Sequence, residues 1–289
     1  MTESTPVHFR RIVVALDGSG HSEAALEAAA RLAAVFDAEL LGMYVEDAAA
    51  LQVAEFDFTF EASRFSTSLS EISVSSLRRE FRVQEQRARR AFEWAARHHR
   101  VRSRFDLVSG SVADELVRAA DAADLITVGQ SGSLSSSRHK IGTTARTVVA
   151  RASGPVLVLR RGLRFDLPVV VLYDYDAEDS GAALDIGRAL ARQDRLTPLV
   201  VLVEAPSASE WATTERKVLE RLGPEANQIE TERVRCDSTD DVVSKAHRRR
   251  AGVLVVPAGS RGVQAERLAD LVSASDMPVM LVRGPVRVP

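Results

Sequence analysis

The chain has 289 residues, with 38 basic and 40 acidic side chains and a formal charge of −2. This length favours two domains, and the near-neutral balance argues against a dedicated nucleic-acid binder, because binding to phosphate backbones needs a basic face. The single cysteine, Cys236, excludes an intrachain disulfide and thiolate metal clusters, and it favours a reducing compartment.

The first part of the chain predicts a strand–helix–strand unit. Residues 11–16 form an apolar, β-branched run that ends at Asp17 and a Gly/Ser-rich turn. Residues 22–36 are strong helix formers with an apolar stripe, and residues 38–45 have the pattern of a second strand. A right-handed crossover makes two such strands parallel.

Residues 46–75 depart from this rhythm, with alternating phenylalanines followed by a serine-rich run. Long connections of this kind are lids, binding loops or mobile segments, and both a functional cap and a tolerated insertion remain open. A long charged helix is expected at residues 77–99. Its basic and acidic residues alternate, which favours a solvated face over a nucleic-acid patch.

The same alternation continues to the middle of the chain and predicts an open parallel α/β sheet of five strands. The remaining elements of this half are strands at 104–109, 124–128 and 155–159 and helices at 112–120 and 144–151.

After a linker at 160–164 the pattern restarts, which indicates an internal duplication. We therefore expect two domains of one fold, residues 1–162 and 163–289, each with a parallel five-stranded sheet covered by helices on both faces. The two halves are expected to pack as an intramolecular pseudo-dimer. The matching segments are 169–174 with 12–17, 180–184 with 22–26, 199–203, 230–235 and 253–257 with the second, third and fourth strands, and 277–283 with 154–160.

The loop at residues 129–144 joins a strand end to a helix start and carries Gly129, Gly132 and Gly142. Glycine lets backbone approach a ligand closely, and a helix N-terminus offers unpaired N–H groups to an anion. The functional interpretation is a nucleotide phosphate loop; the alternative is an ordinary surface loop of small residues. In the second half Gly259 and Gly262 match the first two glycines, but nothing matches the third, so we expect no nucleotide there.

Asp17 and Gly129 each end a strand, so they flank one crevice if those strands are neighbours. A carboxylate in that position accepts hydrogen bonds from an adenine amino group or a ribose hydroxyl. The alternative is that Asp17 only opens a turn. Its recurrence as Asp174 in the second half fits this alternative better.

The strand ending Val-Ala-Leu-Asp17, the spacing Gly129-x2-Gly132-x9-Gly142-Thr143 and the closing Gly-Pro-Val-Leu-Val strand resemble the ATP-binding signature of the universal stress protein family. The resemblance covers both halves, so the chain resembles a tandem member with an adenine nucleotide alpha hydrolase-like fold. It implies strand order 3-2-1-4-5 and binding of ATP or AMP, with or without Mg²⁺.

The resemblance also implies a set of nucleotide-binding residues, with the base near the first two strands and the phosphates in the loop. These residues are Ala15, Leu16, Asp17, Val45, Val128, Gly129, Gly132, Ser133, Gly142, Thr143 and Thr144.

No catalytic set or metal cluster is legible, so we expect a non-catalytic stress-response regulator. One alternative is a nucleotide-independent adaptor that uses residues 48–75, and another is a slow ATPase or a protein that autophosphorylates on the serines at 133–137. The partners expected are adenine nucleotide, an unidentified protein and a second copy in a homodimer, with no nucleic acid and no membrane. The amino terminus lacks a signal-peptide core and no run approaches ~18 apolar residues, so a cytoplasmic location is expected.

Overall fold

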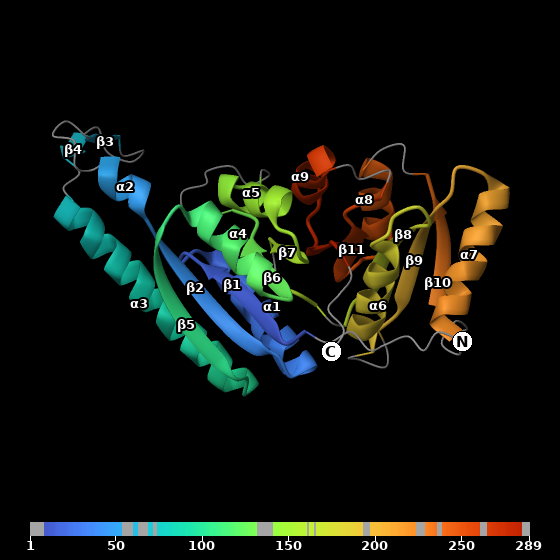
Figure 1. Ribbon diagram of the computed structural model, residues 1–289, viewed down its shortest axis with the longest axis horizontal. Coiled ribbons are helices and arrows are strands. Elements are labelled where there is room, and N and C mark those ends of the chain that lie inside the picture. The colour runs from blue at the N-terminus through green and yellow to red at the C-terminus, as the bar shows by residue number, and fades with distance from the viewer. Residues whose placement is uncertain are drawn as a thin grey trace.

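The computed structural model describes residues 9–53, 60–62, 69–71, 74–131, 141–160, 162–164, 166–192, 197–223, 229–235, 239–260 and 265–284. Its main feature is a ten-stranded sheet with the order β10-β9-β8-β11-β12-β7-β6-β1-β2-β5, shown in Figure 1. None of the helices in the described part of the chain is long and apolar enough to cross a membrane.

The first half of the sheet has the predicted order 3-2-1-4-5, and its neighbouring strands are all parallel. Buried β-branched and aliphatic runs form most of these strands, because helices cover both faces of the sheet. The exception is the edge strand Ser103–Gly110, which has no buried residue. The strands are β1 (Arg11–Leu16), β2 (Glu39–Asp47), β5 (Ser103–Gly110), β6 (Leu125–Gly129) and β7 (Val156–Leu159).

The second half repeats this order with parallel neighbours, which confirms the parallel α/β fold. Its strands are β8 (Val169–Asp174), β9 (Leu199–Glu204), β10 (Ile229–Val234), β11 (Val253–Pro257) and β12 (Val279–Val282).

The prediction of two separate sheets is corrected by the pairing of β7 with β12. These two strands are antiparallel, with Met280 opposite Leu157 at the centre of the register. Because they pair with each other, each strand covers the open edge of the other, and both are buried along their whole length. The two halves consequently share one continuous sheet.

The helices cover the sheet in two layers that each run across both halves. Side chains alternate between faces along a strand, so Ile12 and Val14 pack into one core and Val13 into the other. The first layer consists of α1 (Gly20–Phe36), α3 (Val74–His99), α6 (Ser180–Ala191) and α7 (Ala208–Leu222), and the second of α4 (Val112–Ala122), α5 (Thr143–Arg151), α8 (Thr239–Arg248) and α9 (Ala265–Ala274).

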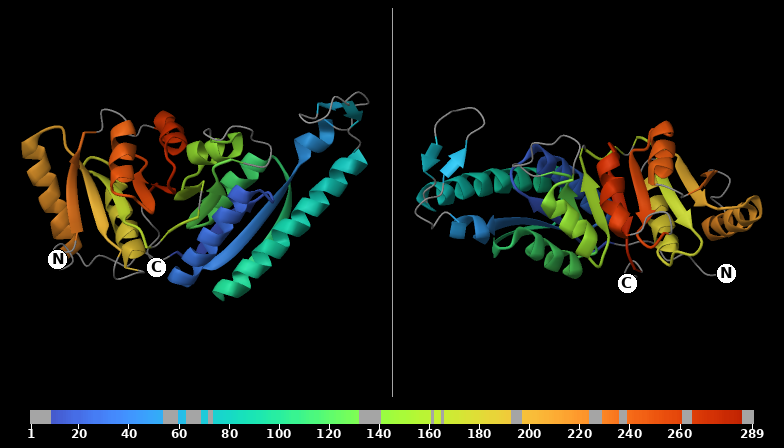
Figure 2. Two further views of the ribbon diagram at one scale, coloured as in Figure 1. Left: turned by 180° about the vertical axis from the view of Figure 1, so that it is seen from behind. Right: turned by 90° about the horizontal axis from the view of Figure 1, so that it is seen from above.

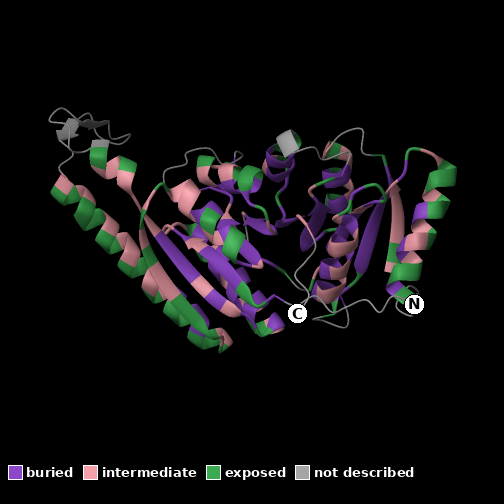
Figure 3. Ribbon diagram, viewed as in Figure 1, coloured by how far each residue is buried: buried purple, intermediate pink, exposed green. Residues whose placement is uncertain are grey.

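The segment between β2 and α3 is partly regular rather than a plain loop. It contains α2 (Ala48–Val53) and the antiparallel hairpin β3 (Phe60–Ala62) with β4 (Leu69–Glu71). Figures 1 and 2 show these elements and the start of α3 extending beyond the end of the main sheet. The buried residues of α3 lie only in its second half, at Ala88, Phe92, Ala95 and Ala96, and its first half is coloured mostly as exposed or intermediate in Figure 3.

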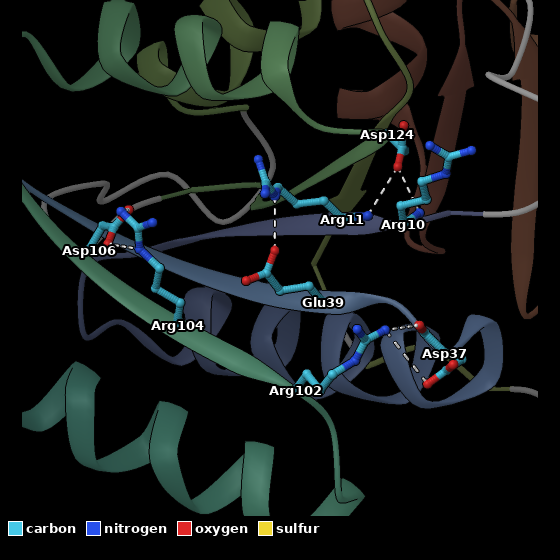
Figure 4. A network of polar contacts seen from close by, with 8 residues as sticks. All are labelled: Arg10, Arg11, Asp37, Glu39, Arg102, Arg104, Asp106 and Asp124. Carbon is cyan, nitrogen blue, oxygen red and sulfur yellow. Dashed lines mark hydrogen bonds and ion pairs between the residues drawn. The ribbon is translucent and has the colours of Figure 1, made fainter. Parts of the chain in front are cut away.

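The amino ends of the first-half strands are tied together by polar contacts, drawn in Figure 4. The Asp124 carboxylate accepts hydrogen bonds from the backbone N–H groups of Arg10 and Arg11 at 2.7 and 3.0 Å. The Arg11 guanidinium pairs with Glu39 at 3.1 Å, which links β1 to β2. Those predicted binding residues that the structure describes lie at the opposite, carboxyl edge of the sheet.

Candidate functional site

The strand order reverses between β1 and β6, and this junction is where the candidate site lies. The two strands are parallel neighbours, with Val13 opposite Ile126. Asp17 directly follows β1 and Gly129 is the last residue of β6. The sequence prediction that both residues flank one position is therefore confirmed, and ligands of open α/β sheets bind at such reversal points.

Asp17 shapes the turn between β1 and α1. Its Oδ1 accepts a hydrogen bond from the Ser19 N–H at 2.9 Å, and its own N–H donates to the Ser22 hydroxyl at 3.4 Å. Ser19 in turn caps α1 by accepting from the Ser22 N–H. The carboxylate is partly exposed at the carboxyl edge.

Asp174 makes the same two contacts in the second half. Its Oδ1 accepts from the Asp176 N–H at 3.0 Å, and its N–H donates to the Ser180 hydroxyl at 3.0 Å. Unlike Asp17, the Asp174 side chain is fully buried. Turn formation is thus common to both aspartates, and only Asp17 is accessible from solvent.

Gly129 is required by packing, because a Cβ at this position would lie 2.9 Å from both the carbonyl carbon and the Cβ of His21. The first turn of α1 therefore sits directly against the end of β6. This close approach explains the glycine independently of any ligand.

The prediction that Gly259 matches Gly129 is wrong. Gly129 pairs with the last residue of β7, and the residue that pairs with the last residue of β12 is Pro257. The next residues, Gln130 and Ala258, each donate a backbone hydrogen bond to the fifth strand of their own half. Sequence similarity aligned Gly259 with Gly129. The strand pairing shows instead that Pro257 is the counterpart of Gly129, so Gly259 lies two residues beyond the equivalent position.

The predicted base-contacting residues divide between the two faces of the sheet. Ala15 and Val45 are partly buried and pack on the α4–α5 side together with buried Val128, whereas Leu16 packs on the α1–α3 side. Val108, which the sequence analysis did not select, pairs with Val45 and is also partly buried on the α4–α5 side. The alternation of apolar and polar residues in the third strand could have identified Val108 from the sequence.

The ends of the glycine loop meet at the start of α5. The Gly142 N–H donates to the Gln130 carbonyl at 2.7 Å, and Gly142 is the N-terminal capping residue of the helix. Thr143 is exposed and Thr144 partly buried in the first turn. Gly132 and Ser133 lie outside the described residues. The described part of the loop therefore places a helix N-terminus beside the end of β6, a geometry that suits anions.

His21 is a further residue of this junction that the sequence analysis did not select. Its Nδ1 lies 3.4 Å from the Ser131 hydroxyl oxygen. The equivalent residue is Asp179, which likewise precedes the serine that contacts the strand-end aspartate, and its Oδ1 accepts from the Gly284 N–H at 2.7 Å. The sequence could have identified this position, because the first copy has a histidine where the second copy has an aspartate.

Tyr44 on β2 lies on the α1–α3 side near the same edge. Burial, together with the charges of Glu46 and Asp17, raises the pKa of its phenol to about 12. The hydroxyl donates to the Gln84 side chain in α3 at 3.3 Å. Tyr44 therefore stays neutral near physiological pH and links β2 to α3.

Fold and junction together define a doubly wound α/β protein built from two copies of one unit. Residues 8–160 match the universal stress protein family, which is more than half of the chain. The chain belongs to the universal stress protein family, as the sequence motifs indicated.

Two relatives match about half of the chain. A universal stress protein of Methanocaldococcus jannaschii is 29% identical over 155 residues, covering 53% of this chain and 83% of that protein. A universal stress protein of Mycolicibacterium smegmatis is 28% identical over 156 residues, covering 51% of this chain and 47% of that protein.

Two solved structures match nearly the whole chain. A universal stress protein from Archaeoglobus fulgidus superposes with a TM-score of 0.66 at 16% identity, covering 94% of this chain and 96% of that one. A protein from Pseudomonas aeruginosa described in the same terms gives a TM-score of 0.57 at 13% identity, covering 95% and 93%. At such identities the likeness concerns the fold alone.

Proposed function

We propose that this chain binds ATP or AMP in its first half and acts as a non-catalytic regulator. The observation that carries the proposal is the meeting of β1, β6 and the N-terminus of α5 at one edge, closed by the hydrogen bond from Gly142 to Gln130. Nucleotide occupancy would then bias the conformation or the partner choice of the protein.

The base and ribose are assigned to the strand ends. Ala15, Val45 and Val108 present partly buried apolar side chains on one face of three adjacent strands, which suits an adenine ring. The Asp17 carboxylate is an acceptor for an adenine amino group or a ribose hydroxyl.

The phosphates are assigned to the start of α5. Its first N–H groups and the hydroxyls of Thr143 and Thr144 supply donors, and the helix dipole favours negative charge there. His21 adds an imidazole at the base of the same loop. The family resemblance assigns Gly132 and Ser133 to the phosphates as well.

The second half is proposed to bind no nucleotide. Asp179 stands where the first half has His21, and a carboxylate repels phosphate at that position. Asp179 also accepts a hydrogen bond from the Gly284 N–H just after β12, so this carboxylate already has a partner within the second half.

A matched pair of isosteric variants tests the role of Asp17. Asp17→Asn keeps the acceptor for the Ser19 N–H and removes the charge, and Asp174→Asn makes the same change in the second half. Titration calorimetry of the full chain with ATP, AMP and adenosine should show all three affinities reduced about tenfold in the first variant, which is about 1.4 kcal/mol. The second variant should bind as the wild type does. Equal binding by both variants would remove Asp17 from the site, and no binding by the wild type would refute the function.

The phosphate assignment has its own test. Thr143→Val removes a hydroxyl from the first turn of α5, and Thr147→Val is the control one turn later, where the hydroxyl donates only to the Thr143 carbonyl. Only the first change should weaken ATP binding relative to adenosine. Phosphate release and protein phosphorylation after incubation with ATP and Mg²⁺ should stay at background, since the proposal is non-catalytic.

A second candidate function, protein capture by the insertion, is favoured by the way α2, the β3–β4 hairpin and the start of α3 extend beyond the sheet in Figures 1 and 2. Replacing residues 54–73 by a short Gly/Ser linker should leave nucleotide binding unchanged under the first proposal. Cross-linking mass spectrometry of the full chain and this variant would show whether partner contacts map to the insertion. If they do and ATP does not bind, the adaptor function replaces the regulator.

A further inference from the structure

Both ends of the glycine loop, which belongs to the first half, contact α9 of the second half. At the first end, the Gln130 side-chain amide donates to the Val272 carbonyl at 3.2 Å. At the other end, the Ile141 N–H donates to the Ser273 hydroxyl at 3.4 Å. Gln130 is only 4% exposed. A buried amide without a hydrogen-bond partner is energetically costly, so the contact to α9 helps to make a glutamine acceptable at this position.

The helix that follows the loop is also held at its far end. The Arg283 guanidinium, just after β12, donates to the Ala152 carbonyl at 2.7 Å and to the Val149 carbonyl. A cation is favourable at a helix C-terminus, where carbonyl groups lack partners within the helix. Burial lowers the pKa of Arg283, but an arginine side chain stays charged in proteins.

The hydrogen bonds that the first half donates to the second differ from those that the second half donates to the first. Val149 and Val272 occupy equivalent places before the fifth strands, and each carbonyl accepts from the opposite half, one from Arg283 and the other from Gln130. The counterpart of Gln130 is Ala258, which has no side-chain donor. The glutamine therefore occurs only in the half with the longer loop.

We propose that α9 of the second half positions the two ends of the glycine loop of the first half, with Gln130 and Ser273 as positioning residues. By fixing both loop ends, these contacts hold the N-terminus of α5 beside the end of β6. The inference rests on the proposed function, because it makes the second half a structural support for phosphate binding in the first. It gives the second half a role even though that half binds no nucleotide itself.

Two variants and one control test the proposal in the full chain. Gln130→Met keeps the volume of the side chain and removes the donor, and the Val272 carbonyl retains the Ser275 N–H. Ser273→Ala removes the acceptor for Ile141. Its control is Thr213→Ala, because the Thr213 and Ser273 hydroxyls both donate to the carbonyl one turn earlier, but the Thr213 hydroxyl lies in α7, away from the loop.

The readouts are the affinities for ATP and for adenosine, together with amide hydrogen exchange at residues 141–142 without nucleotide. We expect Gln130→Met to weaken ATP binding about fivefold and Ser273→Ala about twofold, with adenosine affinity and the control variant unchanged. Exchange at residues 141–142 should accelerate in both variants. Unchanged ATP affinity and exchange would overturn the inference, as would an equal loss for ATP and adenosine. A wild type that binds neither ligand while the variants still accelerate exchange would refute the proposed function and leave the positioning contact supported.

Discussion

The carboxyl edges of the two halves share a fold and differ in chemistry. Both keep the strand order and the turn in which an aspartate accepts from the N–H two residues later. They differ at three equivalent positions, where the first half has His21, Gly129 and Gln130 and the second has Asp179, Pro257 and Ala258. The aspartate turn serves the fold in both copies, but Asp174 is fully buried and Asp17 is partly exposed, so only Asp17 can also contact a ligand. The positions at which the residues differ are further candidates for function.

The largest effect is expected at Gly129. Gly129→Ala forces a methyl group to 2.9 Å from the His21 backbone, so the free energy of unfolding should fall by about 2 kcal/mol. Gly259→Ala is the control, since its nearest neighbour would be a carboxylate oxygen at 3.6 Å, an ordinary contact. Urea denaturation of both variants measures the difference. Equal stabilities would mean that α1 does not pack against β6 as described.

The next effect concerns the equivalent arginines after the fifth strands. Arg283→Met should lower the free energy of unfolding by about 1.5 kcal/mol, because two partly buried, charge-assisted hydrogen bonds to the C-terminal end of α5 are lost. Arg160→Met should cost less than about 1 kcal/mol, since Arg160 pairs with the exposed Asp276. Chemical denaturation of the full chain compares them, and a larger loss at Arg160 would reverse this ranking.

A smaller effect is expected on ligand binding when the first half is made to resemble the second. His21→Asp should weaken ATP binding about tenfold, or about 1.4 kcal/mol, while adenosine binding stays unchanged, because the added carboxylate repels only the phosphates. Asp179→Asn retains an acceptor for the Gly284 N–H and should leave both affinities unchanged. A loss for ATP and adenosine alike in His21→Asp would indicate a disturbed fold instead.

The smallest effect is a pH dependence within the first half. Hydrogen bonds from the Ser111 hydroxyl and the Arg151 guanidinium hold the pKa of the Asp114 carboxyl below its usual 3.8. Its stabilising contribution is therefore present above pH 3.8 and is lost as the pH falls through the lowered value. In a double-mutant cycle of Asp114→Asn and Arg151→Met, the coupling should be measurable near neutral pH and vanish in acid. A coupling that is constant with pH would contradict the ion pair.

Much of the fold could be predicted from the sequence, because apolar runs mark buried parallel strands clearly. Every strand of the main sheet lies within two residues of its predicted bounds, and the duplication gave the equivalence of the halves. The β3–β4 hairpin was not predicted, since its short strands lie in a segment without a clear period. The pairing of β7 with β12 was also missed, because both strands are apolar on each face, as interior parallel strands are.

The candidate site was less accessible to sequence reasoning. Gln130 follows a strand and has the appearance of a loop residue, and only the packing of α9 reveals that it is buried. Gly129 was selected for ligand approach, whereas the structure shows that His21 already requires it. Contacts between segments far apart in the chain leave no local pattern, so these roles needed the structure.

The antiparallel pairing of β7 with β12 also affects how the chain reaches its fold during synthesis. The first half leaves the ribosome early, and its last strand has four residues that are all buried in the finished protein. Until β12 emerges, one side of β7 has unpaired N–H and C=O groups, and an apolar open edge pairs readily with another chain. A second nascent copy presents the same edge and can enter the same antiparallel arrangement. Pairing with β12 therefore removes from the completed chain an edge that could otherwise associate with a second copy.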